Sequence, residues 1–231
     1  MLTTFLTDIC WLPVSDFPGR VIRGRFSLTA YHDALWQQAA LPFPDHLSAA
    51  VAKRRAEYLA GRLLARQALE ALGYLQRVVA RGADRAPVWP DGIVGALSHN
   101  ADTALCAVAP AADSGGVGLD VETQMPMQRA EQLWSGIVNP AEQAWLRQQP
   151  LPFNLSLTLT FSAKESLFKA LYPQVQRYFD FLDAQIVALD PQAQTFTLAL
   201  LQDLTPQCPA GRRFGGRFTL GGDNVTTFIF F

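Results

Sequence analysis

This sequence of 231 residues has few cysteines, few histidines and almost no net charge. It has three cysteines, three histidines and a formal net charge of −1 at pH 7. Cys10, Cys106 and Cys208 are widely separated, which matches neither a zinc-type spacing nor a disulfide framework and favours a reducing compartment. A nearly neutral chain offers no general attraction to nucleic acid or to an anionic membrane surface. We therefore expect a cytoplasmic protein with no nucleic-acid partner.

Long apolar runs are absent as well. No stretch of the sequence is long enough to span a bilayer. The N-terminus lacks a basic start and Asp8 interrupts its apolar run, so we expect no signal peptide. With 49% hydrophobic and 17% charged residues, the composition is that of a soluble globular protein with a sizeable core. We find no internal repeat, and a turn at 113–116 is predicted to separate two halves.

The stretch 161–171, Phe-Ser-Ala-Lys-Glu-Ser-Leu-Phe-Lys-Ala-Leu, predicts a short helix. Ser162 can cap its N-terminus and Pro173 is expected to end it. Glu165 and Lys169 are four residues apart, so they share one face of the helix. Taken alone, this pair is most simply a solvent-exposed ion pair.

A second stretch, 116–122, predicts a buried strand that carries two acids. Gly118, Asp120 and Glu122 alternate with apolar residues and so share one face. Two carboxylates on one face repel each other unless a cation lies between them. Glu165 would complete an all-oxygen set that suits Mg²⁺, with Mn²⁺ as a substitute, rather than zinc. The alternative is a solvated edge strand.

Basic residues concentrate between positions 51 and 90. A helix is predicted for 45–72, with Asp45 as its cap and Gly73 at its end, and a loop for 77–92. The region has only three acids, and its basic residues are Lys53, Arg54, Arg55, Arg62, Arg66, Arg77, Arg81 and Arg85. Such a surplus suits an anionic ligand, although a solvated basic face is the alternative for any single arginine.

The remaining pattern mixes strands with one further helix. Asn139 is predicted to cap a short helix that runs to about residue 148, while 151–160 is apolar without a clear period. Strands are predicted at 21–28, 93–98, 103–109, 179–189 and 195–201, and a closing hairpin at 217–220 and 225–231. His32 and His46 stand in no recognisable context, and we interpret them as incidental.

The acidic strand and the helix, in this order, resemble the signature of the 4′-phosphopantetheinyl transferases. The family pattern is a Gly-Ile-Asp-Ile-Glu-like strand and, some forty residues later, a Lys-Glu-x-x-x-Lys helix. Here these are Gly118-Leu-Asp-Val-Glu122 and Lys164-Glu-Ser-Leu-Phe-Lys169. The segments 52–62 and 85–90 are similar to the family's first helix and its Lys/Arg-x-Pro-x-Trp-Pro loop. The resemblance extends from about residue 51 to 183 and is strongest to the enterobactin-synthetase type within the surfactin-type group.

Two departures from the family pattern are mild, and neither removes a ligand. Val121 replaces the usual isoleucine between the two acids, and Phe161 stands where the larger group often has tryptophan.

The resemblance implies an α+β fold of two similar α+β halves, 1–115 and 116–231, with the active site in the cleft between them. It implies Mg²⁺-dependent transfer of the 4′-phosphopantetheine arm of coenzyme A to a serine of an apo acyl or peptidyl carrier protein. The by-product would be adenosine 3′,5′-bisphosphate. The pathway served would be the synthesis of a siderophore, a nonribosomal peptide or a fatty acid. We expect a monomer. One alternative is a Mg²⁺-dependent hydrolase of coenzyme A or nucleotide pyrophosphates without a protein acceptor.

Residue roles follow from the same resemblance. Asp120, Glu122 and Glu165 would hold the metal, Glu165 would be the base for the carrier serine, and Lys169 would neutralise charge on the pyrophosphate. Tyr178 would lie near the pantetheine arm, with plain packing as an equal alternative. The nucleotide end would be bound by Arg54, Arg62, Arg81, Arg85, Ser98 and His99. A coenzyme A-binding module without activity is disfavoured, because all three acids and the lysine are present.

Overall fold

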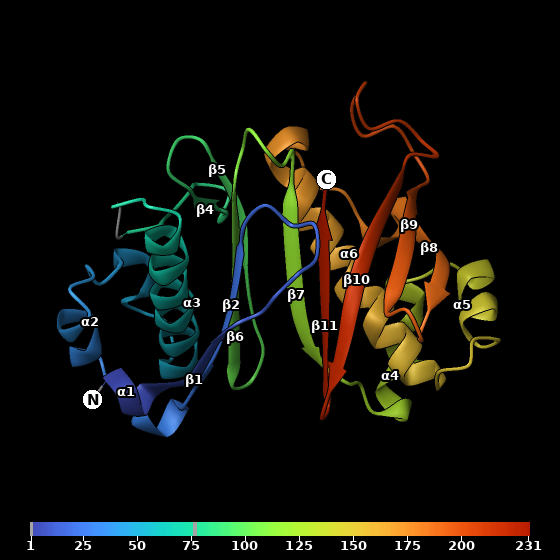
Figure 1. Cartoon of the computed structure of the whole chain (residues 1–231). Coiled ribbons are helices and arrows are strands. Elements are labelled where there is room, and N and C mark those ends of the chain that lie inside the picture. Colours follow the sequence, from blue (N-terminus) through green and yellow to red (C-terminus); the bar gives the residue numbers. More distant parts are fainter. Residues whose placement is uncertain (1, 76–77) are drawn as a thin grey trace. The chain divides into compact units, whose positions relative to one another are not determined.

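The computed structural model describes residues 2–75 and 78–231, and it divides into two compact units, Met1–Gly115 and Gly116–Phe231 (Figure 1). Each unit combines helices with a sheet, and every strand pair among the described residues is antiparallel. The expected α+β class is therefore confirmed. Arg77, one of the basic residues of the predicted loop, lies outside the described residues.

The N-terminal unit is a four-stranded sheet in the order β1-β2-β6-β5 with one long helix, α3, packed against β2, β6 and β5 (Figure 1). A hairpin of two short strands, β3 and β4, precedes β5. The elements are α1 (Leu2–Phe5), β1 (Leu6–Trp11), β2 (Arg20–Phe26), α2 (Ala34–Gln38), α3 (Ala52–Ala71), β3 (Ala80–Arg81), β4 (Pro87–Val88), β5 (Ile93–His99) and β6 (Thr103–Pro110).

Helix α3 begins later than its sequence pattern indicates. Asp45 belongs to a separate 3₁₀ turn, Asp45–Leu47, and Val51 is the residue before the helix, so the prediction that Asp45 caps it was wrong. Gly73 follows the helix with φ +85°, a conformation that glycine adopts at no steric cost. The predicted loop is in part the β3–β4 hairpin, and Arg85 lies in its turn with φ +73°.

The C-terminal unit is a five-stranded sheet in the order β7-β11-β10-β9-β8, and α6 packs against β7 and β11 (Figure 1). The predicted strands and the Asn139-capped helix are present, but 181–183 is a 3₁₀ turn that delays the start of β8. The elements are β7 (Val117–Thr123), α4 (Met127–Leu133), α5 (Pro140–Leu146), α6 (Phe153–Val175), β8 (Ala184–Asp190), β9 (Thr195–Leu200), β10 (Arg213–Gly221) and β11 (Asn224–Phe230).

Helix α6 is much longer than the short helix predicted at 161–171. Ser162 is fully buried in its interior and caps nothing, and Pro173 lies inside its last turn without ending it. The chain leaves the helix only at Gln176, with φ +50°. The first turns of the helix lie within 151–160 and were not predicted. This part of the helix is buried on most sides, so its sequence has no polar stripe. Among the described residues no helix, α6 included, is long and apolar enough to cross a membrane.

The contact between α6 and β7 depends on a glycine. A Cβ atom on Gly118 would lie 1.8 Å from the carbonyl oxygen of Ser166 and 2.9 Å from the amide nitrogen of Ala170. Any side chain at this position would therefore push the helix away from the strand. Next to this contact, the hydroxyl of Thr227 on β11 shares hydrogen bonds with Ser162 (2.9 Å) and Ser166 (2.7 Å). The helix is held directly on the strand that carries Asp120.

Candidate active site

Asp120 on β7 and Lys169 on α6 form a largely buried ion pair. The Lys169 Nζ atom donates to Asp120 Oδ1 at 2.7 Å and to the Leu119 carbonyl oxygen at 3.2 Å. The exposed fractions of the two side chains are 4% for Asp120 and 24% for Lys169. This burial disagrees with two alternatives that the sequence left open. One was a solvent-exposed pair of Glu165 and Lys169, and the other was a solvated edge strand at 116–122.

Glu122 and Glu165 lie within electrostatic range of this pair. Burial, together with the charges of Asp120 and Glu165, raises the pKa of Glu122 to about 7, while Lys169 and Arg129 oppose the shift. Burial also raises the pKa of Glu165; Lys169 lowers it and Asp120 raises it. The three predicted acids are thus brought together and repel one another, and Lys169, with Arg129 acting on Glu122, compensates part of this repulsion.

The three carboxylates suit a divalent metal ion through the type of donor atom that they offer and through their negative charge. Among the described residues, no group of three or more His, Cys, Asp or Glu side chains is arranged to hold a metal ion. Lys169 neutralises Asp120 instead. The donor set nevertheless consists of carboxylate oxygens alone, which Mg²⁺ prefers, and its mutual repulsion is what a divalent cation would relieve. Asp120, Glu122 and Glu165 therefore fit this ion by their chemistry.

A cavity of about 80 Å³ opens beside Glu165, in the same unit. Phe168 is one of its lining residues, and its ring centroid lies 5.0 Å from that of Phe179 and 5.7 Å from that of Tyr178. Tyr178 is 73% exposed, so its ring stands at the entrance. The cavity is lined by Lys164, Glu165, Leu167, Phe168, Tyr178, Phe179, Asp180, Phe181 and Ala184. Four of these nine residues are aromatic, and two, Glu165 and Asp180, carry carboxylates; we call this cavity the aromatic slot.

In the N-terminal unit, the fold brings Arg54 and His99 together from positions 45 residues apart. Arg54 Nη1 lies 3.0 Å from His99 Nε2, and a guanidinium can only donate, so His99 Nε2 is the acceptor here. Glu57 Oε2 lies 3.5 Å from Arg54 and 3.8 Å from His99. Ser98 precedes His99 on β5 and is buried. Arg54, Glu57 and His99 form one polar cluster at the end of β5.

Arg62 is the most buried of the predicted cations. Its guanidinium lies 4.1 Å from the centroid of the Tyr58 ring, and Nη2 donates to the Tyr58 hydroxyl at 3.0 Å. Its Nε atom is buried without a hydrogen bond to any described residue, and burial lowers the pKa of this arginine. A cavity of about 180 Å³ opens beside it, lined by Trp36, Leu41, Pro42, Pro44, His46, Tyr58, Arg62, Val78, Val79, Ala80 and Arg81.

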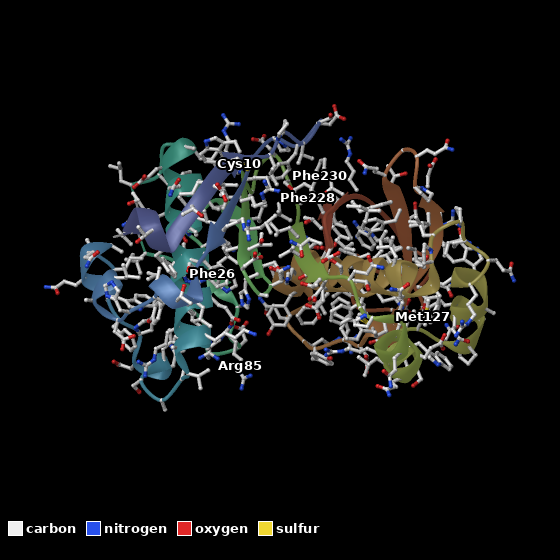
Figure 2. All side chains as sticks on the ribbon, turned by 90° about the horizontal axis from the view of Figure 1, so that it is seen from below. Cys10, Phe26, Arg85, Met127, Phe228 and Phe230 are labelled. Carbon is white, nitrogen blue, oxygen red and sulfur yellow. The ribbon has the colours of Figure 1, made fainter. Side chains whose placement is uncertain are left out.

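The structure adds to the sequence interpretation of two residues. His46, interpreted as incidental, lines the Arg62 cavity with its ring edge-on to Tyr58 at 5.3 Å. Burial lowers the pKa of His46, and Arg81, Arg62 and Arg54 lower it further. Arg85 is exposed and lines neither cavity; it projects from the β3–β4 turn at the edge of the unit (Figure 2). No local pattern in the sequence pointed to His46, because the cavity's Tyr58, Arg62 and Arg81 come from other segments.

Two family models match the chain, and together they cover more than half of it. Residues 43–109 match the 4′-phosphopantetheinyl transferase N-terminal domain. Residues 116–216 match the 4′-phosphopantetheinyl transferase superfamily. The second match contains the acidic strand and the whole of α6.

Curated relatives agree with these matches. The 4′-phosphopantetheinyl transferase Svp of Streptomyces mobaraensis is 37% identical over 211 residues, or 87% of this chain and 82% of that protein. Enterobactin synthase component D of Escherichia coli (strain K12) is 42% identical over 160 residues, or 69% and 72%. The component D of Salmonella typhi is 43% identical over 144 residues, or 62% of this chain, and the chain spans only 58% of that relative's length. The chain belongs to the 4′-phosphopantetheinyl transferase superfamily.

Proposed function

We propose that this protein transfers the 4′-phosphopantetheine arm of coenzyme A to a serine of an apo acyl or peptidyl carrier protein and releases adenosine 3′,5′-bisphosphate. The observation that carries the proposal is the group of three carboxylates beside Lys169 where β7 meets α6. The names of the relatives support it, since one is a 4′-phosphopantetheinyl transferase and others are components of enterobactin synthase.

Asp120, Glu122 and Glu165 are the residues that would hold Mg²⁺, or Mn²⁺ in its place. A divalent cation bound there supplies charge neutralisation to the pyrophosphate of coenzyme A. Everything else in the reaction is positioning and proton transfer, which the chain's own side chains perform.

Glu165 is the proposed base for the carrier serine. Burial raises its pKa, and a carboxylate with a raised pKa accepts a proton more readily at neutral pH. Lys169 is proposed to donate to the phosphate oxygen on which charge develops as the leaving group departs. The proposal is supported by the hydrogen bond from its amine to Asp120, which keeps Lys169 next to the carboxylates.

The nucleotide end of coenzyme A is assigned to the N-terminal unit. The Arg62 cavity offers a buried guanidinium whose Nε makes no hydrogen bond to any described residue, with Arg81 beside it, which suits a phosphate. Arg54 and His99 belong to the polar cluster at the end of β5, where Ser98 precedes His99, and Arg85 would add charge from the exposed β3–β4 turn. The aromatic slot beside Glu165, with Tyr178 at its entrance, is assigned to the pantetheine arm.

The same proposal includes the setting of the reaction. The acceptor would be a carrier protein of siderophore or nonribosomal peptide synthesis, or of fatty acid synthesis, and the chain would act as a monomer in the cytoplasm. Cys10, Cys106 and Cys208 are all free thiols, which fits a reducing compartment.

Intact-protein mass spectrometry tests the proposal. The protein is incubated with coenzyme A, Mg²⁺ and an apo peptidyl carrier domain, and in parallel without the carrier. We expect the carrier to gain one phosphopantetheine and coenzyme A to stay intact when the carrier is omitted. Breakdown of coenzyme A without a carrier would show a hydrolase instead, and neither product would show a binding module.

A further inference from the structure

The two lysines of the Lys-Glu-x-x-x-Lys motif point to different places. Lys169 joins the acidic group, whereas Lys164 is buried with 2% of its side chain exposed. Lys164 Nζ donates to Glu142 Oε2 at 2.8 Å and to the Ile137 carbonyl oxygen at 2.8 Å. A lysine amine enclosed in this way cannot reach a phosphate. The proposed transfer mechanism therefore assigns no task to Lys164.

Glu142 connects its ion pair with Lys164 to a third element of the fold. This carboxylate comes from α5 and has 1% of its side chain exposed. Its second oxygen, Oε1, accepts a hydrogen bond from the Ile186 backbone N–H of β8 at 2.7 Å. The turn of α6 that contains Lys164 is thereby fixed to α5, to β8 and to the segment before α5.

The same turn of α6 is fixed on its other side. At 100° per residue, Ser162 lies about 160° around the helix from Lys164, and its hydroxyl bonds to Thr227 of β11. Glu165 lies between these two attachments, about 60° from Ser162. The direction in which the Glu165 carboxylate projects is therefore set by the attachments on either side of it.

We propose that Lys164 and Glu142 are positioning residues that hold the turn of α6 carrying Glu165 in the orientation needed for transfer. The inference rests on the proposed function. A buried ion pair contributes little stability compared with apolar side chains of similar volume, so stability alone does not account for it. Its three directed hydrogen bonds fix an orientation, which apolar contacts would leave looser.

A pair of variants separates positioning from stability. Lys164→Met and Glu142→Leu, made singly, each leave one buried charge without its partner and should lower the melting temperature clearly. The double variant Lys164→Met/Glu142→Leu has no such charge, and its melting temperature should return toward wild type. Glu131→Gln, in an exposed pair with Arg147 at 2.6 Å, is the control and should change neither stability nor transfer.

Steady-state transfer to an apo peptidyl carrier domain is then measured for each variant. For the folded double variant we expect kcat to fall by on the order of 10²-fold, the effect of a misplaced catalytic group, with the KM for coenzyme A unchanged. Lys164→Arg keeps the charge and the hydrogen bonds and should stay within about tenfold of the wild-type kcat. If the first double variant does not fold, Lys164→Met/Glu142→Gln makes the same comparison, since glutamine can still accept from Ile186.

Wild-type kcat in either folded double variant would overturn the inference and leave the proposed function standing. A wild-type protein that forms no holo carrier would overturn the proposed function, and the positioning role with it. A matched fall in kcat and rise in KM would also count against positioning, because it would indicate a general loss of the site.

Discussion

Gly118→Ala tests whether close contact between β7 and α6 is what builds the acidic site. The new Cβ would lie 1.8 Å from the Ser166 carbonyl oxygen and 2.8 Å from its carbonyl carbon. Both are backbone atoms of a helix, so no side chain can rotate away and α6 itself must move by about 1 Å or more. Overpacking of this kind costs about 1–3 kcal/mol, and a shift of about 1 Å at a catalytic group can cost on the order of 10²-fold in rate.

Urea denaturation and steady-state transfer measure the two effects. We expect Gly118→Ala to lower the free energy of unfolding by about 2 kcal/mol or more. The matched control is Gly215→Ala on β10, where the added Cβ meets nothing within 4 Å. Alanine in place of an unstrained glycine is neutral or stabilises by up to about 1 kcal/mol, because it restricts the unfolded chain. Equal stability and equal turnover in the two variants would refute the account of this contact.

Three further predictions concern single side chains. Arg62→Ala should raise the KM for coenzyme A roughly ten- to hundredfold and leave that for dephospho-coenzyme A nearly unchanged; equal rises would reject its role at the 3′-phosphate. Lys169→Ala should lower kcat by on the order of 10²–10³-fold, and unchanged turnover in the folded variant would exclude it from the reaction. Folding raises the pKa of Glu122 from 4.5 to about 7. Metal-free wild type should therefore lose stability relative to Glu122→Gln as the pH rises through that range, and melting temperatures of the two proteins that change in parallel with pH would contradict this.

The strand with the acids could be predicted because its alternation is a local property. Val117 to Thr123 form β7, and Asp120 and Glu122 share the face with Gly118, as the period of two requires. What the sequence could not show is what covers that face. Glycine at 118 is equally compatible with an exposed bulge, and only the structure shows the backbone of α6 against it.

Features that depend on contacts between distant parts of the chain could not be predicted from the sequence. The extent of α6 was missed because a helix buried on most sides loses the polar stripe that marks its period. The two lysines of the motif are chemically identical in sequence, yet Lys164 binds Glu142 and Lys169 binds Asp120. His46 joins the Arg62 cavity through contacts between segments with no shared pattern.

The most direct test of the central claim is a Mg²⁺ titration of holo-carrier formation, for wild type and for Asp120→Asn. The account predicts that wild type forms holo carrier only when Mg²⁺ is present together with coenzyme A, because Mg²⁺ binds through few carboxylates plus substrate phosphates. Asp120→Asn should form none at any Mg²⁺ concentration. It should still fold in the absence of metal, because the loss of the Lys169 ion pair is offset in part by the removal of one of three repelling charges. Wild-type activity in excess chelator, or full activity of Asp120→Asn, would contradict the account.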